Sequence, residues 1–165
     1  MAAAVILPEG VCIDGADDSK QLSRETRERL HAVILSSARA VGVGAASVRE
    51  IDRRNILRAT TVAMRRALDH LHAAPGHIVI DGLRVKYLGR EHDAVVDGDA
   101  LIHSIGCASI IAKVIRDRLM RRLALRYPGY GWERNVGYGT SEHRAAIVPG
   151  HALYVGLPVT CGALA

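Results

Sequence analysis

The sequence predicts a single α/β domain in which helices pack on a mixed sheet. Short apolar runs typical of buried strands alternate with segments whose apolar residues recur every three or four positions, as in amphipathic helices. The length of 165 residues suits one domain with a sizeable core. The chain contains no internal repeat, linker or low-complexity tract, so we expect residues 1–165 to form one domain.

The first half of the chain is predicted to contain a strand end, two helices and a further strand. Residues 5–7 are the expected tail of a strand, and a polar loop follows at residues 14–20. Ser23 is the expected N-cap of a helix, and a strand at residues 41–45 is also consistent with the pattern. A capping box, S-x-x-E at Ser47 and Glu50, then predicts a second helix. Its inner stripe would be Ile56, Thr60, Met64, Ala67, Leu68 and Leu71.

The second half of the chain is predicted to contain two short strands and a long helix. Pro75 and Gly76 end the second helix, and apolar runs at residues 77–80 and 94–96 predict the strands. The long helix should run from about Ser104 to Arg126, where the approaching Pro128 stops it. Its expected inward positions are Ile105, Ala108, Ile111, Ala112, Ile115, Leu119 and Leu123. The remainder is loop-rich, with one short helix near residues 141–146.

Two aspartates stand at the ends of neighbouring apolar runs. Asp81 closes the run at residues 77–80, and Asp99 follows the run at residues 94–96 through an Asp-Gly-Asp turn. A carboxylate at the end of a buried strand is costly unless a cation meets it. Two such acids indicate a divalent metal held by few protein oxygens and many waters. The competing interpretation is that both are turn or cap residues, because Asp-Gly is a common turn signal.

The composition favours a nucleic-acid partner over a membrane. The net charge is +5 and the pI is about 9.4, which favours contact with phosphates. No long neutral apolar run is present, so we expect no membrane span. The opening MAAAVILP is too short and lacks the basic residues of a secretory signal. Aromatic residues are scarce and Phe is absent, which argues against a stacking platform for single strands.

The three cysteines indicate a reducing compartment. Cys12, Cys107 and Cys161 are odd in number and share no C-x-x-C spacing. We therefore expect reduced thiols in a cytoplasmic protein, and neither a disulfide framework nor a zinc site. The eight histidines show no metal-ligand spacing, so we assign them no role.

The motifs of the chain, taken in order, resemble bacterial ribonuclease HII over nearly the whole length. Matching pieces are AAAVILP, DDSKQLS, EIDRRNILRAT, MRRAL, IDG, GDA, SI-x-x-ASIIAKVIRDRLM, and YPGYGW followed by GYGT-x-EH. The resemblance implies a ribonuclease H-like mixed β-sheet flanked by helices. It also implies cleavage of RNA in RNA–DNA hybrids, including a lone ribonucleotide embedded in DNA, by a protein we expect to be a monomer.

The resemblance also implies a metal site and contacts to the substrate. The family uses four acids around Mg²⁺ or Mn²⁺, and two of them match Asp81 and Asp99. Tyr138 matches a tyrosine that stacks on the sugar at the ribonucleotide–DNA junction. Ser19 and Lys20 match a loop that meets backbone phosphate, and a solvated loop is an equal alternative.

One helix carries a further pair of candidates. Ser109 and Lys113 lie one turn apart, within reach of phosphate, although Lys113 is also placed to neutralise the acids. Asp117 is expected to form a helix-surface ion pair with Lys113. Arg121, Arg122 and Arg126 are expected to form a solvated basic face with weak phosphate contact.

The chain departs from the family pattern at both ends. The D-E-A/V-G-R-G strand, which is central in the family's sheet and holds the other two acids, is absent, and so is the C-terminal H-R-x-S-F segment. On this N-terminally truncated reading we expect unpaired backbone beside the first strand, marginal folding and little or no activity. The alternative function is a non-catalytic hybrid-binding remnant or a pseudogene product.

Overall fold

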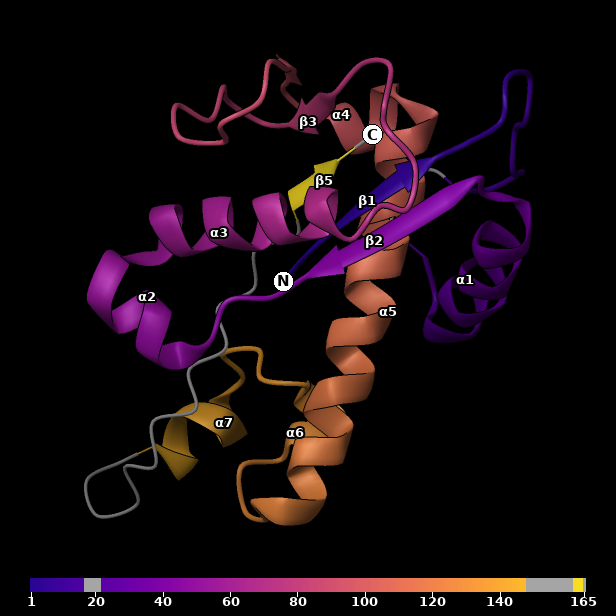
Figure 1. Cartoon of the computed structure of the whole chain (residues 1–165). Coiled ribbons are helices and arrows are strands. Elements are labelled where there is room, and N and C mark those ends of the chain that lie inside the picture. Colours follow the sequence, from indigo (N-terminus) through magenta and orange to yellow (C-terminus); the bar gives the residue numbers. More distant parts are fainter. Residues whose placement is uncertain (17–21, 148–161, 165) are drawn as a thin grey trace.

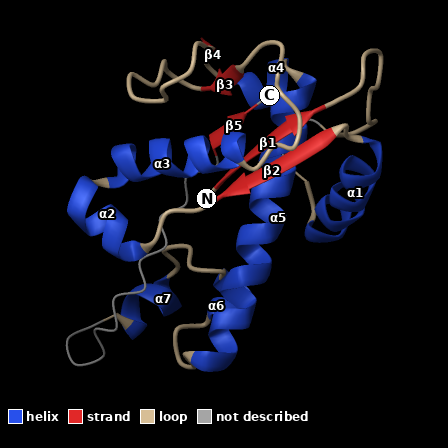
Figure 2. Cartoon of the chain, in the orientation of Figure 1, coloured by secondary structure: helices blue, strands red, loops and turns tan. Residues whose placement is uncertain are grey.

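The computed structural model describes residues 1–16, 22–147 and 162–164, and its centre is a mixed five-stranded sheet (Figures 1 and 2). The predicted α/β class is confirmed. The strands are β1 (Ala2–Ile6), β2 (Ala40–Gly44), β3 (Val79–Asp81), β4 (Asp93–Val95) and β5 (Gly162–Leu164). The helices are α1 (Arg24–Ser37), α2 (Val48–Arg54), α3 (Ile56–Asp69), α4 (Gly98–Leu101), α5 (His103–Arg126), α6 (Trp132–Asn135) and α7 (Ser141–Ala146).

The strands lie in the order β2-β1-β5-β3-β4. β1 is antiparallel to β2 along its whole length, and β3 is parallel to β4. Between these pairs lies β5, parallel to β1 and antiparallel to β3. Our expectation of unpaired backbone beside the first strand is therefore wrong at residues 2–4, since β5 pairs there. The sequence analysis missed β5, because three residues carry no periodicity.

Helices cover both faces of the sheet, and side chains alternate between them along β1. Ala3 and Val5 pack in one core cluster with residues of α1 and α5, whereas Ala2 and Ala4 pack in a second cluster with residues of α3. α3 lies directly on β2, because a Cβ added to Gly44 would be only 2.0 Å from the carbonyl oxygen of Ala63. A third cluster surrounds a buried tryptophan, Trp132, at the far end of α5.

The capping box at Ser47 and Glu50 is confirmed, but the helix it starts is shorter than predicted. α2 ends at Arg54, and Asn55 has a φ of 67° and caps the new helix α3 with its side chain. Asn tolerates this left-handed backbone better than most residues. Ile56 is then the first residue of α3 and 40% exposed, so its predicted inward position is wrong. Further along α3, Met64, Ala67 and Leu68 are buried as predicted.

Three other predicted elements shift slightly. The strand expected at residues 5–7 is β1, at residues 2–6, and the two short strands are residues 79–81 and 93–95. The long helix begins at His103 and ends at Arg126, close to the predicted limits. None of the helices in the described part of the chain combines the length and apolar character needed to cross a bilayer.

Candidate active site

The two aspartates meet at the carboxyl ends of β3 and β4, the sheet edge where ligands commonly bind in α/β folds. Asp81 is the last residue of β3, and Asp99 lies in α4, which follows β4. The backbone N–H of Gly98 donates to Oδ1 of Asp81 at 2.9 Å. From standard backbone dimensions, the Cα of Asp99 then lies within about 8 Å of that oxygen. The structure therefore brings these two predicted residues together.

A close approach between β3 and α4 produces this arrangement. A Cβ added to Gly98 would lie 3.5 Å from both Cα and Oδ1 of Asp81, and 2.9 Å from Cδ1 of Ile105. A glycine at this position lets the turn after β4 pack tightly on the end of β3. Asp81 is partly exposed, whereas Asp99 is 6% exposed. One carboxylate thus remains accessible beside a largely buried one.

The donor set of this site suits a hard cation. Mg²⁺ is commonly held by one or two carboxylates together with substrate phosphates and waters. Asp81 and Asp99 supply carboxylate oxygens of this kind, and nothing in their chemistry favours a soft metal. The described residues contain no group of three or more His, Cys, Asp or Glu side chains arranged so that they could hold a metal ion. The role of the pair as metal ligands remains a prediction.

Helix α5 connects the aspartates to the other predicted residues. A Cβ added to Gly106 would lie 3.0 Å from the backbone oxygen of Asp99, which places Asp99 against the first turns of α5. Ser109 and Lys113 follow Gly106 by three and seven residues, so they lie on the same face of the helix. Lys113 is about 10.5 Å further along the helix axis than Gly106. Ser109 is only 2% exposed, so in this conformation its side chain lies below the surface at which the predicted contact with phosphate would form.

Lys113 belongs to a buried ion cluster. Its Nζ lies 2.8 Å from Oδ2 of Asp117, and Nη1 of Arg116 lies 3.0 Å from Oδ1 of the same carboxylate. The side chains of Lys113, Arg116 and Asp117 are 12%, 4% and 7% exposed. The partner predicted for Asp117 is correct, but its predicted place on the surface is wrong. The sequence pattern showed the i,i+4 spacing and not the loop that covers this face of α5.

Tyr138 belongs to the loop beside this cluster. Nζ of Lys113 lies 4.5 Å from the centroid of the Tyr138 ring, and Cζ of Arg116 lies 5.1 Å from it. Such cation–π contacts hold the ring in place, while the residue stays 41% exposed. A Cβ on the adjacent Gly137 would lie 2.8 Å from Cε of Met120, so this loop packs closely on α5. The structure therefore brings Tyr138 and Lys113 together.

Arg116 is the residue that the sequence analysis missed. Its Nε and Nη2 atoms are buried and make no hydrogen bond within the described part of the chain. A signal was present, because Arg116 follows Lys113 by three residues and shares its helix face. Of the basic face expected on the same helix, Arg122 and Arg126 are exposed, whereas Arg121 is half-buried.

The remaining predicted residues lie elsewhere. Ser19 and Lys20 fall outside the described residues, as does Cys161. Cys12 and Cys107 are free thiols, in agreement with the prediction for these two; Cys12 is exposed and Cys107 is buried.

One histidine to which we assigned no role has a structural one. His103 accepts the backbone N–H of Ile13 at Nε2, at a distance of 2.8 Å, and so ties the loop after β1 to the start of α5.

Comparison with known proteins identifies relatives over most of the chain. A family model described as Ribonuclease HII matches residues 2–153. Ribonuclease HII of Thermosynechococcus vestitus is 56% identical over 149 residues, which cover 89% of this chain and 69% of that protein. Ribonuclease HII 1 of Methylibium petroleiphilum is 50% identical over 148 residues, which cover 90% of this chain and 75% of that protein.

A solved structure has the same fold. The crystal structure of the ribonuclease H2 from Pyrococcus horikoshii OT3 aligns with a TM-score of 0.62. The alignment covers 88% of this chain and 96% of the archaeal one, at 23% sequence identity. This likeness extends to the fold and not to individual residues.

Proposed function

This chain belongs to the ribonuclease HII family, whose members are divalent-metal-dependent endonucleases, and we propose that it hydrolyses the RNA strand of RNA–DNA hybrids. A lone ribonucleotide embedded in DNA belongs to the same proposed substrate class. The observation that carries the proposal is the 2.9 Å hydrogen bond from Gly98 N–H to Asp81, which juxtaposes Asp81 and Asp99. The proposed cofactor is Mg²⁺ or Mn²⁺.

The proposed chemistry divides between the metal and the chain. When bound, the metal supplies Lewis-acid activation of the attacking water and of the leaving 3′-oxygen. Asp81 and Asp99 would be the ligands that the chain provides to the metal. Because Asp99 is nearly buried, its carboxylate would restrict where the metal can bind. The cluster of Lys113, Arg116 and Asp117 on α5 contains two cations and one anion, and its net positive charge would attract the phosphate backbone of the substrate.

Tyr138 is proposed to recognise the ribonucleotide. Its ring lies beside Lys113, about 10.5 Å along the axis of α5 from Gly106, and Gly106 packs against the backbone of Asp99. Apolar contact with a sugar would let the ring sense the 2′-hydroxyl, which distinguishes RNA from DNA.

Substitution of the aspartates tests the metal site. We expect Asp81→Asn and Asp99→Asn each to weaken Mn²⁺ binding at least tenfold, measured by electron paramagnetic resonance, and to abolish any cleavage of a hybrid that the unaltered chain, or the chain extended at its N-terminus, carries out. Asp97→Asn is the matched control, because Asp97 is exposed and its φ of 56° is tolerated by Asn. Equal loss of Mn²⁺ binding in the Asp81 and Asp97 variants would contradict the proposal.

The same assays separate the enzyme from a non-catalytic binder. We expect a chain extended at its N-terminus by a D-E-A-G-R-G strand to bind Mn²⁺ more tightly, because a hard cation gains affinity from additional carboxylates. Metal-dependent cleavage that requires Asp81 would support the proposed function. Hybrid binding without metal-dependent cleavage, in both the chain and its extended form, would favour the non-catalytic alternative and reject the proposal.

A further inference from the structure

A basic pocket lies on the outer side of α3, apart from the two aspartates. Its volume is about 230 Å³, and its lining consists of Arg54, Arg58, Thr61, Val62, Arg65 and Tyr87. Tyr87 comes from the loop between β3 and β4, which extends over α3 in Figure 1. Cζ of Arg58 lies 5.5 Å from the centroid of the Tyr87 ring, and Nζ of Lys86 lies 5.9 Å from it.

The arginines of this pocket have no acidic partner within the part of the chain that the structure describes. Arg54, Arg58 and Arg65 are exposed, and none of them forms a salt bridge there. Nearby arginines differ, since Arg66 pairs with Glu50 at 2.7 Å. Uncompensated charges gathered in one pocket attract an anion.

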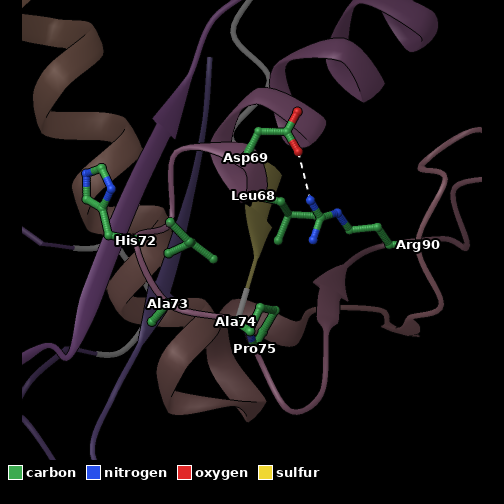
Figure 3. A pocket seen from close by; sticks show the side chains of 8 residues that line it. Leu68, Asp69, His72, Ala73, Ala74, Pro75 and Arg90 are labelled. Atoms are coloured by element: carbon green, nitrogen blue, oxygen red, sulfur yellow. Dashed lines mark hydrogen bonds and ion pairs between the residues drawn. The ribbon is translucent and has the colours of Figure 1, made fainter.

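A second hollow shows the contrast. It is lined by residues 68–69 and 71–75 together with Arg90, and its single arginine is neutralised by Asp69 at 2.8 Å (Figure 3). An anion would meet little free positive charge there. The pocket of Arg54, Arg58 and Arg65 is therefore the better candidate for an anionic ligand.

The spacing of the arginines favours a polyanion over a single phosphate. Arg58 and Arg65 lie two turns apart on α3, about 10.5 Å along its axis. Residues 49–66 as a whole contain six arginines and two acids, so the positive charge continues onto α2. A row of this length suits consecutive phosphates of a nucleic-acid strand, where charges repeat every 3.4 Å or so. Side chains of arginine also suit phosphate because they can donate two parallel hydrogen bonds.

The pocket also lies within reach of the same duplex as the aspartates. Tyr87 follows Asp81 by six residues, so the two Cα atoms are at most about 22 Å apart. We propose that Arg54, Arg58 and Arg65 form a second contact to the phosphate backbone of the bound duplex, away from the scissile bond. The proposal rests on the proposed function for the identity of the duplex, and the contact itself requires neither ribose nor metal.

The test compares two triple variants of equal charge. One carries Arg54→Gln, Arg58→Gln and Arg65→Gln. Its control carries the same change at three exposed arginines in and just after α1, which packs on the opposite face of the sheet from α3: Arg24, Arg29 and Arg39. Affinity for a 30-base-pair all-DNA duplex and for a hybrid of that length is measured by fluorescence anisotropy over a range of salt concentrations, and thermal melting checks that each variant folds.

We expect the pocket variant to lose at least tenfold in affinity for both duplexes at low salt. Its slope of log affinity against log salt should fall by about two to three, since each lost phosphate contact removes about 0.9. The control should change affinity less than twofold.

Three results would overturn the inference. The first is an equal loss of duplex affinity in both triple variants, which would show that the effect depends on net charge and not on the pocket. The second is an unchanged slope in the pocket variant. The third is saturable binding of inorganic phosphate or a nucleoside monophosphate at the pocket with unchanged duplex affinity, which would assign a small ligand instead. The all-DNA duplex keeps the test independent of cleavage, so a failure of the proposed ribonuclease activity would leave this result interpretable.

Discussion

Removal of the Asp117 charge should destabilise the protein far more than removal of an exposed carboxylate. Asp117 balances Lys113 and Arg116, and all three side chains are at most 12% exposed. Asp117→Asn keeps the shape of the side chain but leaves two buried cations without an anion. Breaking a buried ion pair in this way costs about 3–5 kcal/mol. At about 2–4 °C per kcal/mol for a domain of this size, the melting temperature should fall by about 6–20 °C.

The matched control is Asp69→Asn. Asp69 pairs with Arg90 at a similar distance of 2.8 Å, but these side chains are 57% and 42% exposed. Solvent screens such a pair, so its loss should cost less than about 1 kcal/mol. Both variants are compared with the unaltered chain by thermal denaturation and by urea titration. The comparison isolates burial, because the substitution and the distance are the same.

A second variant separates charge from packing. Adding Lys113→Met to Asp117→Asn removes one of the two unbalanced cations and keeps an aliphatic chain at that position. We expect this double variant to be more stable than Asp117→Asn alone, and a double-mutant cycle gives the coupling between the two positions. The reasoning fails if Asp117→Asn and Asp69→Asn lose the same stability, or if the double variant recovers none of it.

Three further substitutions test other parts of the fold and site. Gly44→Ala should lower the free energy of unfolding, measured by urea denaturation, by about 3 kcal/mol or more, because the new Cβ would lie 2.0 Å from a backbone oxygen of α3. Gly76→Ala is its control and should leave the free energy of unfolding unchanged, because a Cβ added there meets nothing within 4 Å. Hydrogen bonds from Arg66 and from the helix cap lower the pKa of Glu50 to about 2. In thermal melts, Glu50→Gln should therefore be less stable than the unaltered chain by a constant amount above about pH 4.5, and this difference should vanish as the pH falls towards 2. Tyr138→Ala should reduce discrimination between a ribonucleotide junction and all-DNA duplex more than total affinity, and Tyr138→Phe should retain it; equal loss on both duplexes would contradict the assigned role.

Local signals in the sequence predicted the elements that depend on local interactions. The limits of α5 follow from its apolar period and from Pro128, and the capping box marks the start of α2. The proximity of Asp81 and Asp99 could also be predicted from the sequence, because two apolar runs that are each followed by an acid suggest neighbouring strand ends. The register of Asp81 opposite Val95 in parallel strands accounts for their proximity.

Features that depend on distant packing could not be predicted in this way. Asp117 looked like a surface residue because its i,i+4 partner is charged, and its burial comes from a loop more than a dozen residues away. The break at Asn55 is invisible to a period of three or four, since both α2 and α3 satisfy it. The pairing of β5 with β1 joins residues about 160 positions apart over only three pairs, and no local pattern encodes such a contact.

Helix α5 fixes the geometry on which the proposed specificity depends. Asp99 lies against the helix near Gly106, and Tyr138 is held over it by Lys113 and Arg116. Because these contacts are made to one continuous helix, the axial distance between them is set by its rise of 1.5 Å per residue and not by a mobile loop. The buried Asp117 anchors the two cations that hold the Tyr138 ring. Burying Asp117 costs desolvation free energy. In return, the charge cluster of Lys113, Arg116 and Asp117 keeps the ring of Tyr138, which is proposed to contact the sugar, at a constant distance from Asp81 and Asp99, the proposed metal ligands.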